Sequence, residues 1–365
     1  MGLPELYFAY QTAAETVSAR SKQGIVALLL QDAGVTAGVY TVANEADIPA
    51  ELGADNVDYV KRALVGYTNR PQKLYLSVVG TDGGAEDALA QLTSLSYDYV
   101  AGFPDSDATD AKALADGVIA RRAKNYIGKA VVPSYAANDV GVVNFTGTGI
   151  VAAAGTFGGV TLPAGEFTTA EYCSRIAGVL AGTPAEGSAT GAALDEVTEV
   201  TVVDDEDLDE DIEAGELCLY HDGRKVRIAR AVSSYAPSGN LTTILRKIKA
   251  IEVIDLIHYY AVTTADDQYR GQCANTYDNK CLLVAALQDY LRSLEPELLA
   301  EDSSSAQIDL EATRAYLKEQ GTDVTDMSDE EIRRADTGSY VFISLGGHIV
   351  DAMEDFKIVL ALTNR

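Results

Sequence analysis

Basic residues are scarce in this chain of 365 residues. Lysine and arginine number 28 against 55 aspartates and glutamates, which gives a formal net charge of -27. A surface this negative repels other polyanions, so the charge argues against nucleic acid and against an anionic membrane as direct partners. A basic or polar partner surface is favoured instead. With 47% hydrophobic residues, the chain is nevertheless long enough to bury two or three cores.

Cysteines and long apolar runs are also few. The four cysteines lack the close spacing of a metal-binding knuckle and no secretory signal accompanies them, so we expect reduced thiols and no metal site. The longest apolar runs, residues 25–30 and 150–154, fall far short of the roughly 18 residues that a membrane-spanning helix needs. We therefore expect no membrane-embedded segment. The cysteines are Cys173, Cys218, Cys273 and Cys281.

The motifs of common enzyme classes are missing. The sequence contains neither Gly-x-Ser-x-Gly nor His-Glu-x-x-His, and we expect structural roles for its three histidines, His221, His258 and His348. Gly147-Thr148-Gly149 suggests a phosphate-binding loop, but the third glycine and a following Gly-Lys-Ser/Thr are absent. We accordingly predict no catalytic residue and no cofactor-binding residue.

What the chain does contain is a regular alternation of strand and helix patterns in its first part. Parallel strands need crossover connections, so this alternation predicts an α/β fold with a mainly parallel, covered sheet. The expected strands are residues 25–30, 73–79, 97–101 and 130–133, and the expected helices are residues 55–66, 85–95 and 108–124, the first capped by Asp55.

The later part of the chain differs in residue composition. Its strand and helix patterns predict a further α+β domain at the C-terminal end. Asp222-Gly223 is a strong turn dipeptide and predicts a hairpin with arms 216–220 and 225–230. Further strands are expected at 141–145, 149–153, 197–203, 339–345 and 348–351, and helices at 169–181, 250–264, 279–299, 310–319 and 328–335. We divide the chain into an arm at 1–22, an α/β domain at 23–140, a strand-rich middle part at 141–237, a C-terminal domain at 238–350 and a final extension at 351–365.

An acidic stretch lies between the expected strand 197–203 and the hairpin. Five of its residues fall at the offsets one, three, five, seven and twelve of a helix-flanked calcium loop. Glu210, however, occupies offset six, where such a loop needs glycine, and the flanks read as strands. We favour a solvated acidic loop and keep a calcium-stabilised binding module as an alternative. The five residues are Asp205, Asp207, Asp209, Asp211 and Glu216.

A second alternative is an enzyme with an acidic active site. Asp105 and Asp107 follow a strand end, where open parallel sheets bind ligands, and His221 could act with them as an acid or base. The simpler interpretation is that Ser106 or Asp107 caps the helix beginning at Ala108, because acids are favoured in the first helical turn.

Both ends of the chain carry alternating apolar residues. An exposed apolar strand with unpaired backbone groups is usually blunted by proline, charge or a bulge, and here only Pro4 and Lys357 serve that purpose. We therefore predict that both ends pair with a further strand. The residues on the pairing faces are Leu6, Phe8 and Tyr10 at the start, and Phe356, Ile358, Leu360 and Leu362 at the end.

Several segments, in this order and spacing, carry a resemblance to a known family. They are Gly2-Leu3-Pro4, residues 19–27, residues 167–184, residues 222–234, Tyr277-Asp278-Asn279-Lys280, and residues 336–339 leading to 351–355. Through them nearly the whole chain resembles the tail sheath proteins of contractile bacteriophage tails and phage-tail-like bacteriocins, particularly the short sheaths of Firmicute prophages.

This resemblance implies a structural subunit and no enzymatic activity. Such subunits stack in rings around an inner tube, and their contraction drives the tube through a target cell envelope. The implied partners are other copies of the chain, the inner tail tube protein, and baseplate and tail terminator proteins, with no nucleic acid and no membrane. The implied location is a virion tail or phage-tail-like particle assembled in the bacterial host cytoplasm. In the family, the terminal extensions join a sheet of neighbouring subunits.

Overall fold

The computed structural model describes residues 24–236 and 243–359, and its contacts divide this part of the chain into two units. The first, called the core unit below, comprises residues 24–252 and 352–359. The second, called the helical unit, comprises residues 253–351. The limits expected from the sequence for the five parts of the chain remain predictions.

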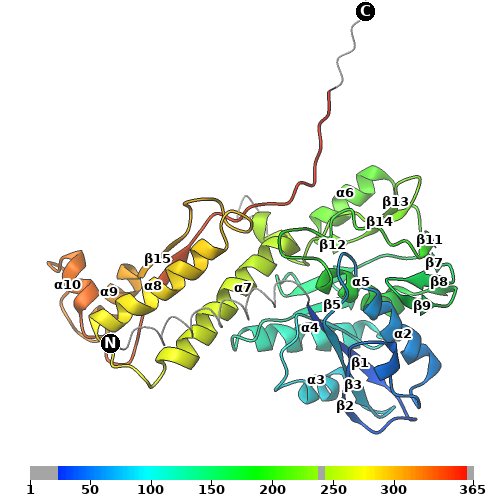
Figure 1. Ribbon diagram of the computed structural model, residues 1–365, viewed down its shortest axis with the longest axis horizontal. Helices are drawn as coiled ribbons and strands as arrows, with labels where there is room; N and C mark the ends of the chain where they lie inside the picture. The colour runs from blue at the N-terminus through cyan, green and yellow to red at the C-terminus, as the bar shows by residue number, and fades with distance from the viewer. Residues whose placement is uncertain (1–23, 237–242, 360–365) are drawn as a thin grey trace, which may run out of the picture. The chain divides into compact units, whose positions relative to one another are not determined.

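A seven-stranded sheet forms the centre of the core unit (Figure 1), in the order β12-β6-β5-β4-β1-β3-β2. Only the edge strand β2 runs antiparallel to its neighbour, so the expected mainly parallel sheet is confirmed. Central β1 places Val26 opposite Leu74 on one side and Tyr99 on the other. The strands are β1 (Ile25–Gln31), β2 (Gly38–Val42), β3 (Lys73–Val79), β4 (Tyr99–Ala101), β5 (Lys129–Pro133), β6 (Val142–Phe145) and β12 (Glu216–Leu217).

Helices cover both faces of this sheet, because successive residues of a strand point to opposite sides. Leu28 and Leu30 of β1 belong to a core with helices α2 and α5, whereas Ala27 and Leu29 belong to a second core with α3 and α4. Helices α2 and α5 pack closely: a Cβ added to Gly178 would lie 2.3 Å from a backbone oxygen of α2. The helices are α2 (Ala54–Val65), α3 (Ala85–Gln91), α4 (Ala108–Arg122) and α5 (Thr169–Ala181).

Short strands follow the main sheet in the chain. They form one three-stranded sheet, β10-β7-β11, and two hairpins, β8-β9 and β13-β14. The hairpin predicted around Asp222-Gly223 is present, but its first arm is shorter than expected: Glu216 and Leu217 instead join the main sheet beside β6. The strands are β7 (Ile150–Ala152), β8 (Gly155–Phe157), β9 (Val160–Leu162), β10 (Gly165–Phe167), β11 (Val197–Glu199), β13 (Leu219–His221) and β14 (Val226–Ile228).

The acidic stretch expected to be a loop is helix α6 (Asp205–Glu213). The side chain of Asp204 caps it by accepting a hydrogen bond from the backbone N–H of Asp207 at 3.0 Å. Three further acids occupy the first turn, where the helix dipole favours negative charge. The expected loop was therefore wrong, and a calcium loop is incompatible with this helical backbone. A similar correction applies to α2, whose N-cap is Gly53 while Asp55 lies in the first turn.

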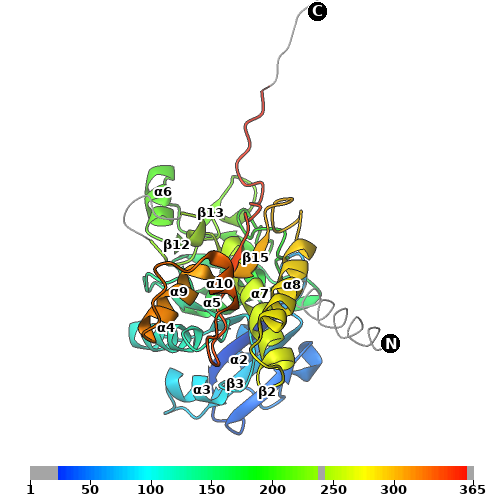
Figure 2. The same ribbon diagram turned by 90° about the vertical axis from the view of Figure 1, so that its left-hand side faces the viewer.

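The helical unit surrounds a two-stranded antiparallel sheet with helices (Figure 2). Of the two strands predicted at 339–345 and 348–351, the first is present as the shorter β16, and its Ile343 pairs with Ile308 of β15. Ile349 instead bridges to Leu299. The elements are α7 (Ile248–Thr264), which begins in the core unit, a π-helical turn η3 (Ala265–Tyr269), α8 (Tyr277–Ser293), β15 (Ser305–Ile308), α9 (Leu310–Glu319), α10 (Asp329–Arg334) and β16 (Ile343–Gly346); the short turns η1 (Glu45–Asp47) and η2 (Thr243–Arg246) lie in the core unit.

A buried ion pair ties three segments of the core unit together. Arg175 of α5 contacts Glu196 with Nε to Oε1 at 2.6 Å, and the two side chains are only 3% and 1% exposed. Arg175 also donates to the backbone oxygen of Gly66 at 2.6 Å, and the Tyr172 hydroxyl donates to Glu196 at 2.7 Å. Oε1 of Glu196 thus accepts two short hydrogen bonds and Oε2 a longer one from Arg175 at 3.4 Å, which gives this buried carboxylate the partners it requires.

We expect Glu196→Gln to lower the free energy of unfolding by about 3–5 kcal/mol, because it leaves the buried charge of Arg175 without its counter-charge. Urea unfolding followed by circular dichroism measures this. The control is Tyr172→Phe, which removes one hydrogen bond and should cost about 1 kcal/mol. Equal losses for the two variants would contradict the dominance of the ion pair.

The same pair gives stability a defined pH dependence. Burial by itself raises the pKa of Glu196, but the Arg175 charge and the hydrogen bonds from Arg175 and Tyr172 together hold that pKa below its usual value. The contribution is therefore fully present above the unfolded carboxyl pKa, about 4.3, and is lost as the pH falls through the lower folded value. Glu196→Gln should remove this acid-side decline, measured as the difference in unfolding free energy between pH 7 and pH 4.

Candidate assembly site

The chain returns to the core unit at residue 352, and Glu354 docks it there. The side chain of Glu354 is only 6% exposed. The Ser188 hydroxyl donates to its Oε1 at 2.7 Å, Arg230 donates to its Oε2 at 3.2 Å, and Lys247 Nζ lies 3.4 Å from the same oxygen. Two cations and a hydroxyl therefore hold one carboxylate.

The chain leaves the protein surface immediately after this contact. Asp355 pairs with Arg230 at 2.7 Å while remaining 79% exposed, and the hydrogen bond that Arg230 donates to Asp355 raises the pKa of Arg230. Phe356, Ile358 and Val359 are then 72%, 87% and 81% exposed. Figure 2 draws this end of the chain in red as a trace with no helix or strand. A run of apolar side chains is thus presented to the surroundings.

The strand predicted at the C-terminal end has no partner within the described residues. Phe356 and Ile358 lie in the described part and have no assigned strand there, since a strand is defined by hydrogen bonds to a second one. Their pairing with a neighbouring subunit stays a prediction. The other predicted arm residues, Leu360, Leu362, Leu6, Phe8 and Tyr10, lie outside the described residues.

The helical unit offers sheet edges that such an arm could extend. Sheet β15-β16 has two strands in the described chain, so each strand has one edge without a strand beside it. On β15 the backbone N–H of Ala306 is satisfied by the side chain of Gln288 at 2.7 Å. Beside β16, Tyr340 and Phe342 lie with their rings nearly parallel, and Tyr340 is 56% exposed. Sequence reasoning did not identify this surface.

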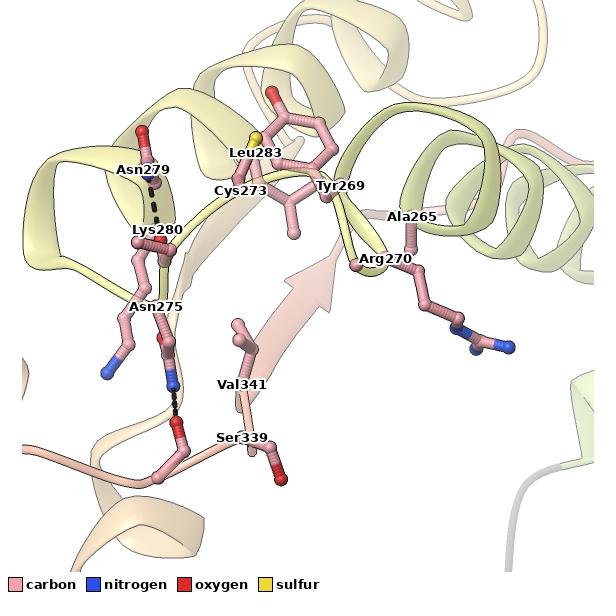
Figure 3. A pocket seen from close by; sticks show the side chains of 13 residues that line it. Ala265, Tyr269, Arg270, Cys273, Asn275, Asn279, Lys280, Leu283, Ser339 and Val341 are labelled. Atoms are coloured by element: carbon pink, nitrogen blue, oxygen red, sulfur yellow. Dashed lines mark hydrogen bonds between the residues drawn. The ribbon is translucent and has the colours of Figure 1, made fainter.

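A pocket of about 590 Å³ lies in the helical unit between η3, α8 and the chain before β16 (Figure 3). Lys280 reaches its wall and donates to the Thr337 hydroxyl at 3.1 Å and to the Ala335 backbone oxygen at 3.3 Å. Burial lowers the pKa of Lys280. Asn275 donates to the backbone oxygens of Gly338 and Tyr340. Lysine and asparagine thus fasten the loop before β16 to α8, which is a structural use of both side chains.

Of the residues considered for an enzyme, Asp107 caps a helix and His221 is bonded within a hairpin turn. Asp107 accepts hydrogen bonds from the backbone N–H groups of Thr109 and Asp110 at 2.7 and 2.9 Å, and these bonds lower its pKa. Asp105 is exposed, and Nδ1 of His221 accepts from the backbone N–H of Gly223 at 3.0 Å in the hairpin turn. The structure does not bring these three residues together as a catalytic group.

One potential metal-binding cluster occurs in the described chain. Ligand atoms of Asp211, Glu216 and Cys218 lie within 4.8 Å of one another. Burial raises the pKa of Cys218 to about 11, and its sulfur lies within hydrogen-bond distance of the Thr146 hydroxyl. A metal ion binds the thiolate rather than the thiol, so these three residues fit a metal poorly. Among residues 24–236 and 243–359, no helix is both long and apolar enough to cross a membrane.

Comparisons with known proteins agree on one family. No family model matches the chain. The tail sheath protein of Clostridium phage phiCD119 is 34% identical over 364 residues, which is 98% of each chain. Two solved structures share the fold: a sheath tail protein from Listeria innocua, with a TM-score of 0.67, 13% identity and coverage of 84% of this chain and 93% of that one, and the contracted helical sheath of the anti-feeding prophage, with a TM-score of 0.65, 15% identity and 93% coverage of both chains.

The full-length match covers the core unit, the helical unit and the C-terminal segment alike. It extends to the residues through which the sequence resembled contractile tail sheaths, and that prediction is confirmed. An identity of 34% over 364 residues is sufficient to establish the family. The chain belongs to the family of tail sheath proteins.

Proposed function

We propose that this sheath subunit polymerises by lending its terminal arms to neighbouring copies. The observation that carries the proposal is the contrast at the C-terminal end. Glu354 is buried among charged partners of its own core unit, whereas Phe356, Ile358 and Val359 are exposed. An apolar extended segment held at one end and uncovered beyond it is suited to add a strand to another chain.

We assign the receiving surface to the edge of β16 in a neighbouring subunit, since the β15 edge is already bonded by Gln288. A two-stranded sheet is only marginally stable alone, and a further strand beside β16 would extend its hydrogen-bond ladder. Each added hydrogen bond contributes about 0.5–1.5 kcal/mol net, so the joint gains strength from number and repetition. Because arm and edge are different surfaces, the contact is heterologous and propagates as an open helical array.

The assembly proposed is a sheath of stacked rings around an inner tube. Its further partners are the tube protein, a baseplate and a tail terminator, and its place is a phage tail or phage-tail-like particle assembled in the host cytoplasm. The known structures of the same fold include a helical sheath in a contracted state. The net charge of -27 favours a basic or polar tube surface.

Contraction in this proposal is a change between two packings of the same subunits. The change lowers the free energy of an initially strained assembly and requires neither nucleotide nor enzymatic activity. The carboxylates of the core unit support this role because they cap helices or neutralise buried cations. The arms keep neighbours joined while the cores move.

Removing the last ten residues, 356–365, separates assembly from folding. The truncated chain keeps Glu354 and Asp355 with their partners but loses the exposed apolar segment. We expect the melting temperature to stay within about 2 °C, because deleted exposed groups contribute little to stability. Tube formation, seen by negative-stain microscopy of the overexpressed protein, should be lost. Tubes as abundant as those of the full chain would contradict the arm proposal.

The double variant Ile358→Asp with Leu360→Asp tests which face of the arm strand packs against the neighbouring subunit. These positions share one face of the predicted strand, so strand addition would bury two unpaired carboxylates and block tubes. Val359→Asp with Ala361→Asp is the matched control, since it adds the same charge to the other face and should reduce assembly less. Sedimentation followed by microscopy measures both. Normal tubes from the first pair would refute the assigned face.

A further inference from the structure

We propose that Glu354 is a positioning residue that anchors the arm to its own subunit and fixes the point at which the arm becomes available to a neighbour. This inference rests on the proposed arm function. Residues up to Asp355 would then stay with the parent core unit in every state of the assembly. Residues from Phe356 onward would belong to the joint with the neighbouring copy.

The most buried contact of the returning segment is made by the Glu354 side chain, and the exposed Asp355 adds a second bond to Arg230. Met353 is 87% exposed and Asp355 is 79% exposed, while Glu354 between them is 6% exposed. Its three partners are Ser188, Arg230 and Lys247, two of them cationic. Arg230 and Lys247 are 32% and 27% exposed, so replacing Glu354 removes a charge-assisted contact that two partly buried cations share and that is worth more than a fully exposed ion pair.

The three partners come from segments that are bonded to one another. The backbone N–H of Ala231, next to Arg230, donates to the Thr190 hydroxyl at 3.0 Å. The backbone N–H of Ile248, next to Lys247, donates to the Ala231 oxygen at 3.1 Å. The backbone segments that carry the three partners are therefore joined by hydrogen bonds that do not involve the arm.

The loop that carries Ser188 also holds the start of α7, through which the chain leaves the core unit. Lys249 Nζ donates to the Glu186 backbone oxygen at 2.7 Å. Glu252, the last residue before the helical unit, accepts from Lys129 Nζ at 2.9 Å, and Lys129 is 2% exposed. Glu252 and Ser188 line the same small cavity. The outgoing helix and the returning arm are thus both fastened to the loop 183–190.

The anchor has a direct test in the full-length chain. The sequence has no tryptophan, so Met353→Trp places one fluorophore on an exposed position next to Glu354. The Ile358→Asp and Leu360→Asp pair keeps subunits apart during the measurement. Fluorescence anisotropy of the introduced indole then reports how tightly this segment is held. Circular dichroism melting checks that each variant is folded.

Adding Glu354→Gln should lower the anisotropy most of the way to the value of the urea-unfolded chain. Asp355→Asn is the matched control, because it removes the neighbouring exposed ion pair and should change the anisotropy little. Ser188→Ala is a milder second variant and should give an intermediate decrease if Glu354→Gln fails to fold. An unchanged anisotropy for Glu354→Gln, or a larger decrease for Asp355→Asn, would overturn the assignment.

A second measurement links the anchor to the assembly. Tubes of the Glu354→Gln chain with native arm residues should form and then lose subunits in urea roughly tenfold faster than the parent, the effect expected from losing a charge-assisted contact. Equal rates would count against a role in the assembly. The two failures are distinguishable: absence of tubes from the parent chain contradicts the arm proposal, whereas the anisotropy result tests the anchor whether or not tubes form.

Discussion

The requirement to bury both faces of a parallel sheet shapes the core unit. Leu28 and Ala27 of one central strand face two separate cores, so helices must lie on both sides and the chain must cross over after nearly every strand. Polar side chains are consequently pushed to strand ends and helix starts, where they serve as caps. Asp107 is such a case: its position after a strand resembles that of a catalytic acid, but its oxygen is occupied by two backbone N–H groups.

Buried charge is used in this unit to join segments that are distant in sequence. Arg175 and Glu196 connect α5 to the segment before β11, and Lys129 holds Glu252 at the start of α7. Glu354 repeats the pattern at the returning chain. A hydrophobic contact can slide with little loss, whereas a buried ion pair is lost when one partner is withdrawn. The Lys129–Glu252 pair lies where the chain passes into the helical unit, and the Arg230–Glu354 pair lies where it has returned to the core unit. These pairs therefore fix both crossing points to the core unit.

The sequence predicts the elements whose signals are local and fails where the determining partner is far away. The strand at 73–79 and the helix at 169–181 were predicted with their observed limits, because apolar runs and caps lie within the elements. Helix α6 was missed because its acidic composition indicates solvation more strongly than the single cap at Asp204 indicates a helix. Strand β15 pairs with a strand more than thirty residues later, and nothing in either segment encodes that register. Glu354 is one acid among several in its run, and only the fold shows that Arg230 and Lys247 meet it.

In the proposed joint, the anchor and the arm would resist separation in different ways, and this difference would decide where the segment bends when the sheath contracts. A strand ladder distributes load over many weak hydrogen bonds and keeps its register through alternate side chains. A buried carboxylate fixes one point on the parent core. When cores repack while both attachments hold, the change in direction has to be absorbed between them. Asp355 keeps its ion pair with Arg230, so in the proposed joint we place the hinge at Phe356, between that contact and the first paired arm residue. The side chain of Phe356 is 72% exposed, so few contacts resist its turning.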